Sequence, residues 1–393
     1  SPRPMRDADR RRHVVMRVRN AYTHDSRVEK EARTLVTAGH RVTVVADGAV
    51  GLPGTEDRPG GERVIRVERR GLRLAGLRFV VHELRLLRRL VALRPDVLHA
   101  HDSNALLPVA LAARRCRVPF VYDAHDLWLG RPRRERGRLS FALHQAWYGL
   151  VERVLIPRAA ATITVSPPIV EHLRDRYGLA RVALVPNYPE LEPAPVTLRT
   201  LGSLPGGDRI APDRPIVLYL GGLMGGRGLE TLVDAIARTD GPQLVLLGDG
   251  LLADPLRARA ANLGIGDRVH LLPPVPPAEV IGVAASADLG VSPIPPSCLN
   301  YRYSLPNKLF QYLAAGLPVV ASDFPQVRDV VEGSRCGVVA DPTSAAAMAG
   351  AIESVLADPV EARAMGERGR RAVAERYHWG VAAERLLEVY SAL

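Results

Sequence analysis

Short apolar runs alternate with longer amphipathic stretches along the first half of the chain. Runs rich in β-branched residues predict buried strands at 13–18, 41–46, 64–70, 97–100, 119–122, 161–165 and 182–185. Apolar residues at helical spacing predict helices between these strands, at 26–38, 79–93, 105–113, 139–156 and 171–177. Strands that alternate with helices are typical of an α/β fold with a mostly parallel sheet.

The same alternation begins again at residue 216 and continues to the end of the chain. Strands are predicted at 216–220, 243–247, 269–272, 289–292, 317–321 and 336–339, with helices between them and a helical region from 343 onward. The stretch 190–213, which lies between the two series, is rich in Pro, Gly and polar residues. We therefore predict two α/β domains, at 13–195 and 214–377, joined by a linker at 196–213.

The two ends of the chain and its cysteines carry further signals. Residues 1–12 are basic but have no apolar run after them, so we expect a disordered tail and no signal peptide. A final helix at 378–393 has an apolar side that requires a packing partner. The cysteines Cys116, Cys298 and Cys336 have no metal-binding spacing. We expect free thiols in a reducing cytoplasm.

A net charge of +11 favours an anionic partner, such as a nucleotide or an acidic lipid. Nucleic acid is not expected, because aromatic residues make up only 5% of the chain and no basic run is interleaved with them. The helix at 79–93 carries Val80, Leu84, Leu87 and Val91 on one side and arginines elsewhere. That pattern fits a helix facing the core, and it also fits a helix on an anionic membrane. Peripheral attachment to the inner face of the membrane therefore stays open.

Polar residues cluster where the strands of the first domain end. The carboxyl ends of parallel strands lie along one edge of a sheet, where α/β proteins bind ligands. The candidates at this edge are His24, Asp25, Arg27, His101, Asp102 and His125. Asp25 or Ser26 is also expected to cap the following helix. Histidines and carboxylates can hold a metal, but no pair at i, i+4 spacing supports one here, so we predict no metal site.

The second domain has two features typical of phosphate binding. The loop at 221–228, GGLMGGRG, joins a strand to a helix and has Arg227 as its only charge. In SLPNKLFQYLAAGLPVVAS, at 304–322, a loop opens into a helix with Lys308 in its first turn and Ser304 or Asn307 as a cap. A cation there is unfavourable unless an anion is present. Lysine is rare in this chain: Lys30 is the only other one.

These motifs resemble the family 4 glycosyltransferases of the GT-B fold over nearly the whole chain. PNKLFQYLAAGLPVVAS is similar to the family pattern PNKLFEYMAAGxPVVAS, and GGLMGGRG is similar to GxxxxxKG. HDSRVEKEA, DAHDLW and VPN resemble the family as well. The resemblance implies two Rossmann-like domains with parallel sheets facing a central cleft, and a last helix that crosses back to the first domain. It also implies retaining transfer of a sugar from a nucleotide diphosphate sugar to a hydroxyl acceptor, with no metal and no further cofactor.

The resemblance also assigns roles to individual residues. It implies catalytic roles for His125, Arg227 and Lys308. The donor-side residues that it implies are Gly221, Gly222, Gly226, Gly248, Asp249, Pro274, Val275, Tyr303, Ser304, Leu305, Asn307 and Gln311. The acceptor-side residues are His24, Asp25, Arg27, His101 and Asp102. UDP, GDP and dTDP are not distinguished, and the acceptor is left open between a glycan or lipid-linked saccharide and a secondary metabolite.

The chain departs from the family pattern at three positions. Gly222 replaces a basic residue of the glycine loop, and we expect Lys308 to supply the missing charge. Tyr303 and Gln311 replace a pair of glutamates. Gln311 can still bind a ribose hydroxyl, but without charge assistance. Two alternatives therefore remain: an enzyme that modifies the nucleotide sugar, such as an epimerase or hydrolase, and a nucleotide-binding partner protein without activity.

Overall fold

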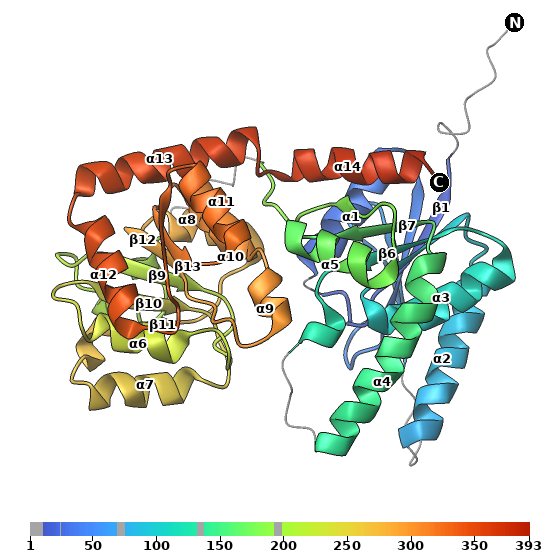
Figure 1. The fold of residues 1–393 in the computed structure, drawn as a ribbon, viewed down its shortest axis with the longest axis horizontal. Coiled ribbons are helices and arrows are strands. Elements are labelled where there is room, and N and C mark those ends of the chain that lie inside the picture. Colours follow the sequence, from blue (N-terminus) through green and yellow to red (C-terminus); the bar gives the residue numbers. More distant parts are fainter. Residues whose placement is uncertain (1–10, 24, 69–74, 132–136, 192–198) are drawn as a thin grey trace, which may run out of the picture. The chain divides into compact units, whose positions relative to one another are not determined.

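The computed structural model describes residues 11–23, 25–68, 75–131, 137–191 and 199–393, and it divides the chain into two compact units. The first unit comprises Ser1–Asn187 together with Ala382–Leu393, and the second comprises Tyr188–Val381. Each unit is built around its own β-sheet (Figure 1).

The sheet of the first unit has the strand order β3-β4-β2-β1-β5-β6-β7-β8. Its strands are β1 (His13–Arg17), β2 (Arg41–Asp47), β3 (Thr55–Asp57), β4 (Arg63–Val67), β5 (Val97–His101), β6 (Phe120–Ala124), β7 (Ala161–Thr164) and β8 (Ala183–Leu184). All pairings are parallel except that of β3 with β4. The short strand β3 was not predicted, because its three residues, TED, form no apolar run.

Helices connect these strands as the apolar spacing predicted. They are α1 (Ser26–Thr37), α2 (Ala75–Ala92), α3 (Ser103–Cys116), α4 (Arg138–Leu155), α5 (Pro167–Tyr177) and, at the end of the chain, α14 (Trp379–Ser391). The buried Tyr390 of α14 joins its hydroxyl to Nδ1 of His99 at 2.8 Å, and its carbonyl oxygen accepts from Arg12 at 2.9 Å. The closing helix therefore packs on the first unit.

The expectation for the apolar side of α2 needs correction. The residues buried in this helix are His82, Leu86 and Leu90, whereas Val80 and Leu84 are 51% and 48% exposed. Both sets recur at helical spacing, and they point in different directions because they are offset by two residues. Periodicity alone could not decide which apolar side faces the sheet. Of the four residues on the predicted apolar side, Val80 and Leu84 are therefore exposed, whereas Leu87 and Val91 are half-buried.

The sheet of the second unit is parallel throughout, in the order β11-β10-β9-β12-β13-β14. Its strands are β9 (Ile216–Leu220), β10 (Gln243–Leu247), β11 (Val269–Leu272), β12 (Leu289–Ser292), β13 (Val319–Ser322) and β14 (Gly337–Ala340). Its helices are α6 (Leu229–Ile236), α7 (Ala253–Asn262), α8 (Val280–Ala284), α9 (Leu299–Tyr303), α10 (Asn307–Ala315), α11 (Pro325–Gly333), α12 (Ala345–Leu356) and α13 (Pro359–Glu375). No helix in the described part of the chain is both long enough and apolar enough to cross a bilayer.

The described part of the expected linker is folded onto the second unit. Leu201 is fully buried, and its backbone N–H donates to the hydroxyl of Ser286 at 2.9 Å. The side chain of Gln243 binds both the N–H and the carbonyl of Ala211, at 2.9 and 2.7 Å. A stretch that looks like a linker by composition is therefore ordered by one apolar anchor and one buried amide.

Each sheet has a position where the strand order reverses, and the candidate residues lie beside it. In the first unit β1 pairs with both β2 and β5, and in the second unit β9 pairs with both β10 and β12. The connections that leave such neighbouring strands run to opposite faces of the sheet, which leaves a crevice at the carboxyl ends. The loops after β1 and β5, and those after β9 and β12, are thus placed for ligand binding.

Candidate functional site

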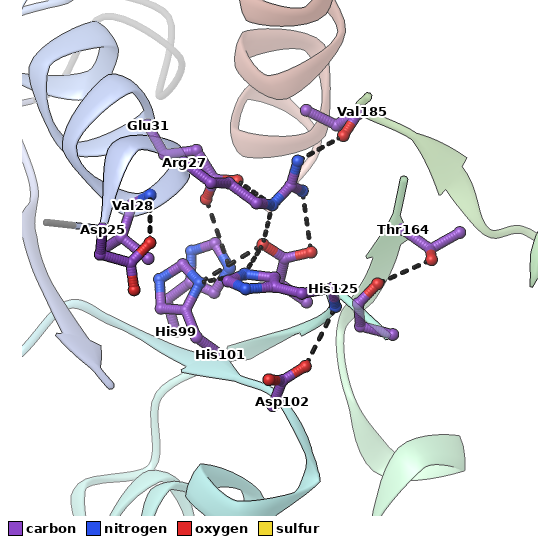
Figure 2. Close-up of polar contacts among 12 residues, drawn as sticks. Asp25, Arg27, Val28, Glu31, His99, His101, Asp102, His125, Thr164 and Val185 are labelled. Carbon is purple, nitrogen blue, oxygen red and sulfur yellow. Dashed lines mark hydrogen bonds and ion pairs between the residues drawn. The ribbon is translucent and has the colours of Figure 1, made fainter. Parts of the chain in front are cut away.

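The cluster in the first unit is centred on Asp123, a fully buried carboxylate in β6. Arg27 of α1 donates to both of its oxygens, from Nε at 3.0 Å and from Nη2 at 2.9 Å, as Figure 2 shows for Arg27. Nη1 of Arg27 donates to the carbonyl of Val185 at 2.6 Å, and its Nε lies 3.0 Å from Oε1 of Glu31. The guanidinium thus ties α1, β6 and the segment after β8 together.

His125 follows β6 and rests on this carboxylate. Its Nε2 lies 2.9 Å from Oδ2 of Asp123, and its backbone N–H donates to Oδ1 of Asp102 at 3.1 Å. Burial lowers the pKa of His125, but the carboxylates of Asp123 and Asp102 outweigh burial and raise this pKa to about 9. His125 is therefore protonated at neutral pH. Because its side chain is 19% exposed, it can donate a hydrogen bond to a ligand oxygen.

Asp102 connects His125 to the surface. This residue has a φ of +65°, and it lies just before α3 without using its side chain to cap that helix. Its Oδ2 accepts from Arg131 at 3.2 Å, and Arg131 also donates to Asp126 at 2.8 Å. The guanidinium of Arg131 lies 4.2 Å from the ring centroid of Trp128. Asp102 thus anchors the loop after β6 at two points, the backbone of His125 and the side chain of Arg131.

A layer of buried residues lies against the Asp123 carboxylate. Nδ1 of His101 is 3.0 Å from Nε2 of His125, and the rings of His99 and His101 stack with centroids 4.2 Å apart. Burial lowers the pKa of both His99 and His101. Burial and then the Asp123 carboxylate raise the pKa of Glu31 to about 8. At neutral pH this layer is therefore neutral, and the charges belong to Arg27, Asp123 and His125.

The spacing of the buried layer also resembles that of a metal site. Four possible ligand atoms lie within 4.8 Å of one another, one each from Glu31, His99, His101 and Asp123. Arg27 already occupies both carboxyl groups, at 3.0 Å from Glu31 and 2.9 Å from Asp123. A cation would have to displace or face this guanidinium, so the arrangement favours hydrogen bonding over metal binding. The absence of a metal remains a prediction.

The structure brings Arg27, His101, Asp102 and His125 together. The side chain of His125 is the most exposed of the four, at 19%. Arg27 and His101 are 4% and 3% exposed, so their side chains are closed to direct contact with a ligand. Asp25 lies at the start of α1 and caps it, with Oδ1 accepting from the N–H of Val28 at 3.3 Å. His24 lies outside the described residues.

The second unit places two cations over two tyrosine rings. Nζ of Lys308 is 3.5 Å from the ring centroid of Tyr219, and the guanidinium of Arg227 is 5.1 Å from that of Tyr301. Within the described residues neither cation pairs with a carboxylate. Burial and then the charge of Arg227 lower the pKa of Lys308 well below its usual range. Neighbouring unpaired cations favour an anionic ligand.

The first turn of α10 adds backbone donors beside Lys308. Pro306 is the N-cap of this helix, and no side chain caps it. The expectation that Ser304 or Asn307 caps α10 is therefore wrong: the Ser304 hydroxyl donates to the carbonyl of Tyr301 at 2.8 Å, and Asn307 is already the first helical residue. The free N–H groups of this turn suit a phosphate.

The glycine loop lies next to Lys308. A Cβ atom on Gly221 would be 3.6 Å from Nζ of Lys308, so the loop backbone and the ammonium are in contact distance. Gly221, Gly226 and Gly228 have positive φ angles of 119°, 77° and 74°. The N–H of Leu223 donates to the carbonyl of Asp249 at 2.9 Å, which joins this loop to the one after β10.

The remaining donor-side candidates surround this point to different degrees. Gln311 is half-buried and lies three residues after Lys308 on α10, so both share one side of the helix. Exposed positions are Gly222, Asp249, Pro274 and Asn307, and half-buried ones are Gly226, Gly248, Val275, Tyr303, Ser304 and Leu305. Pro274 and Val275 follow β11, which pairs in parallel with β10, so they lie at the same edge of the sheet as the loop after β10.

Sequence reasoning missed several residues of both clusters. In the first unit these are Glu31, His99, Asp123 and Arg131, and in the second unit Tyr219 and Tyr301. Asp123 had a usable signal, since it is a charged residue inside the apolar strand FVYDA. Glu31 lies one helical turn after Arg27, at ion-pair spacing. The two tyrosines gave no signal in the sequence, because only the fold brings them beneath a cation.

Both halves of the chain match known protein families. Residues 26–191 match the family described as Glycosyltransferase Family 4, and residues 206–372 match Glycosyl transferases group 1. A glycogen synthase of Mycobacterium tuberculosis is 26% identical over 305 residues, which is 76% of this chain and 69% of that protein. A GDP-mannose-dependent alpha-(1-6)-phosphatidylinositol monomannoside mannosyltransferase of the same species is 30% identical over 319 residues, 73% of this chain and 81% of that protein.

Solved structures share the fold at lower identity. Sucrose-phosphate synthase from Thermosynechococcus elongatus has a TM-score of 0.76 at 21% identity, covering 97% of this chain and 98% of that one. Anabaena HepE in complex with UDP-glucose has a TM-score of 0.73 at 16% identity, covering 97% and 100%. The predicted fold class, a GT-B fold with two parallel-sheet α/β domains, is thus confirmed. The chain belongs to the family 4 glycosyltransferases.

Proposed function

We propose that this protein is a retaining, metal-independent hexosyltransferase that moves a sugar from a nucleotide diphosphate sugar to a hydroxyl acceptor. The observation that carries the proposal is the pair of cations in the second unit. Lys308 and Arg227 have no carboxylate partner among the described residues, and both lie by the glycine loop or the uncapped start of α10. A diphosphate would supply negative charge to these two cations and oxygen acceptors to the free N–H groups at the start of α10.

The relatives support a nucleotide sugar as donor without fixing its base. The mannosyltransferase relative is named as GDP-mannose-dependent, and the HepE structure holds UDP-glucose. Gln311, half-buried on α10, is our candidate for the ribose contact. Tyr303, at the position of a family glutamate, leaves the donor sugar open.

The reaction follows from the charges. The bond between the anomeric carbon and the diphosphate oxygen breaks, and negative charge develops on the leaving diphosphate. Lys308, Arg227 and the first-turn N–H groups of α10 stabilise that charge. The acceptor hydroxyl forms the new bond to the anomeric carbon on the same face of the sugar, and its proton passes to the departing phosphate oxygen. We assign to Lys308 the charge that Gly222 does not provide.

His125 has an orienting role in this proposal. A side chain with a pKa of about 9 is protonated at neutral pH and cannot act as a general base there. Its imidazolium instead donates a hydrogen bond to an oxygen of the donor sugar or of the acceptor. Arg27 and Asp123 hold the ring in place, since Arg27 binds both oxygens of the carboxylate that contacts His125.

Thermal unfolding with UDP, GDP, dTDP and ADP tests the donor site. A ligand at 100 times its dissociation constant stabilises by about 2.7 kcal/mol, a shift of roughly 5–10 °C for a domain of this size. One of the four diphosphates should raise the melting temperature of the wild type but not that of Lys308→Ala. The base of that diphosphate identifies the donor nucleotide. The matched control is Arg363→Ala, which removes an exposed cation of α13. If no diphosphate produces a shift, the proposal fails in favour of a partner protein without nucleotide binding.

Turnover with the matching nucleotide sugar tests the catalytic roles. Lys308→Ala and Arg227→Ala should each lower kcat by about two orders of magnitude or more, because each removes a cation from the leaving group. Near-normal rates for both variants would contradict the assignment. Product analysis without any acceptor separates the transferase from an epimerase or hydrolase, which would convert the donor alone.

A further inference from the structure

The outward face of α4 is apolar along its whole length. Five large side chains on it are exposed: Leu139 at 74%, Leu143 at 63%, Trp147 at 44%, Leu150 at 59% and Val154 at 38%. Their spacing of four, four, three and four residues places them on one side of the helix. The opposite side is the buried one, with Tyr148, Val151 and Glu152. The helix is therefore apolar on both sides, and only one side is used by the fold.

The helices beside α4 extend this apolar surface. The structure packs α3 against both α2 and α4, and Figure 1 shows the three helices on the same flank of the first unit. On α3, Leu111 is 45% exposed, and on α2, Val80 and Leu84 are about half exposed. We call these residues and the α4 side chains together the helical face. Scattered exposed leucines are ordinary, but a row of five large apolar side chains on one side of a single helix is not.

The charges around the helical face are of one sign. The exposed charged residues in the described parts of α2, α3 and α4 are Arg88, Arg89, Arg114, Arg115 and Arg153. The acidic residues there are Glu83, which is half-buried, and Glu152, which is buried. All five arginines lie toward the carboxyl ends of their helices. An apolar surface whose exposed charges, within the described parts of these three helices, are all arginines complements a bilayer with anionic headgroups.

We propose that the helical face docks the first unit onto an anionic lipid bilayer, with the leucines and Trp147 among the acyl chains and the arginines at the headgroups. A second copy of the chain fits less well. Two such faces packed together in a symmetric pair would bring arginine-bordered surfaces of the same charge against each other. A lipid surface offers both the apolar layer and the opposite charge.

Vesicle sedimentation with the full chain tests the proposal, and it needs no nucleotide or acceptor, so its outcome is separate from that of the proposed function. The protein should sediment with vesicles of phosphatidylcholine and phosphatidylglycerol, and much less with phosphatidylcholine alone or at high salt. The double variant Leu143→Gln/Leu150→Gln should bind roughly tenfold more weakly or worse. Its control is Val360→Gln, which changes a 79% exposed residue of α13 and should bind normally.

A second pair of variants tests the charges. Arg114→Gln/Arg115→Gln should weaken binding to the anionic vesicles about 10- to 30-fold, whereas Arg363→Gln/Arg371→Gln, which removes two exposed arginines of α13, should have a small effect. Equal effects of both pairs would show that only net charge matters and would overturn the docking surface. All these positions are exposed, and melting temperatures confirm that each variant is folded.

Tryptophan fluorescence shows whether the face itself enters the lipid. Anionic vesicles should shift the emission of the wild type to shorter wavelength, and Trp147→Phe should lose this shift while it still sediments. Three results would overturn the proposal: no binding of the wild type, full binding of Leu143→Gln/Leu150→Gln, or self-association in solution that this variant abolishes without any vesicle binding. The last result would assign the face to a second copy of the chain.

Discussion

Lys308 lies in the second unit with its Nζ above the ring of Tyr219 and beside Gly221. Its pKa is held well below the usual range by burial and then by Arg227. A diphosphate reverses the balance, since its negative charge favours the protonated ammonium. We therefore predict that Lys308 takes up a proton when a nucleoside diphosphate binds under mildly alkaline conditions, and that affinity falls as pH rises.

Calorimetry in two buffers of different ionisation enthalpy measures that proton. The wild type should show net uptake at about pH 8.5, where the diphosphate itself is fully ionised, and Lys308→Arg should show none, because arginine stays charged at this pH. Equal proton uptake by the two proteins would place the titrating group elsewhere.

His125 gives the first unit a pH-dependent stability. Its pKa is raised from 6.5 to about 9 in the folded protein. A group whose pKa is raised on folding stabilises the folded protein fully at pH values below its pKa in the unfolded chain. That stabilisation is lost as the pH rises through its pKa in the folded protein. We predict that the free energy of unfolding falls by about 1–3 kcal/mol between pH 6.5 and pH 9 through this group.

Urea unfolding of wild type and His125→Gln across that range provides the measurement. The variant should lose part of the slope and retain the part from Glu31, whose pKa of about 8 makes stability fall over the lower end of the same range. Identical slopes in the two proteins would mean that His125 is not paired with Asp123 in solution.

At the scale of elements, helices and strands were largely predictable and their orientation was not. The alternation of apolar runs located nearly every strand, because buried parallel strands leave a continuous apolar signal. The predicted apolar side of α2 was wrong at Val80 and Leu84, because these exposed residues repeat as regularly as the buried Leu86 and Leu90. The predicted cap of α10 was also wrong. A serine whose hydroxyl donates to a nearby backbone carbonyl, as Ser304 does to Tyr301, looks the same in the sequence as a serine that caps a helix.

The junction of the glycine loop with α6 supports a prediction at this scale. Gly228 is the N-cap of α6 with a φ of +74°, and a Cβ atom there would lie 1.8 Å from the carbonyl oxygen of Pro293. Gly228→Ala should thus push the loop away from the segment after β12 and cost about 2 kcal/mol or more.

The neighbouring Gly225 is the control for this substitution. A Cβ atom on Gly225 meets nothing within 4 Å, so Gly225→Ala should leave the melting temperature nearly unchanged. Gly228→Ala should lower it by roughly 4–8 °C. Should both variants melt like the wild type, the loop would be able to move without strain, and the contact with Pro293 would not constrain it.

For the whole molecule, the candidate residues could be located at sheet edges from the sequence, but their partners could not. His125, Lys308 and Arg227 could be selected because they occupy strand-end loops and a helix start. Their surroundings depend on contacts between distant segments, such as Arg27 with Asp123 and Lys308 with Tyr219. No spacing rule links such pairs, so the protonation of His125 and the lowered pKa of Lys308 became visible only in the fold.

The closing helix shows how a distant segment reaches the cluster of the first unit. Tyr390 of α14 is buried, and its hydroxyl is the hydrogen-bond partner of His99 Nδ1, one layer away from His125. Removing residues 382–393 should therefore destabilise the first unit, while the second unit, which does not include them, keeps its nucleotide-dependent thermal shift. Tyr390→Phe should do so more mildly, by about 1–3 kcal/mol, because it leaves a buried ring nitrogen unpaired.

Unfolding scans of the full chain, the truncated chain and Tyr390→Phe, each with and without the matching diphosphate, separate the two units. The transition that responds to nucleotide, which belongs to the second unit, should keep its temperature in all three proteins. The transition of the first unit should move to lower temperature, slightly in Tyr390→Phe and further in the truncated chain. Loss of the nucleotide shift on truncation would mean that the second unit requires α14 for its fold. If the unfolding transition of the first unit did not move, Tyr390 and α14 would not contribute to the stability of the sheet that carries His125.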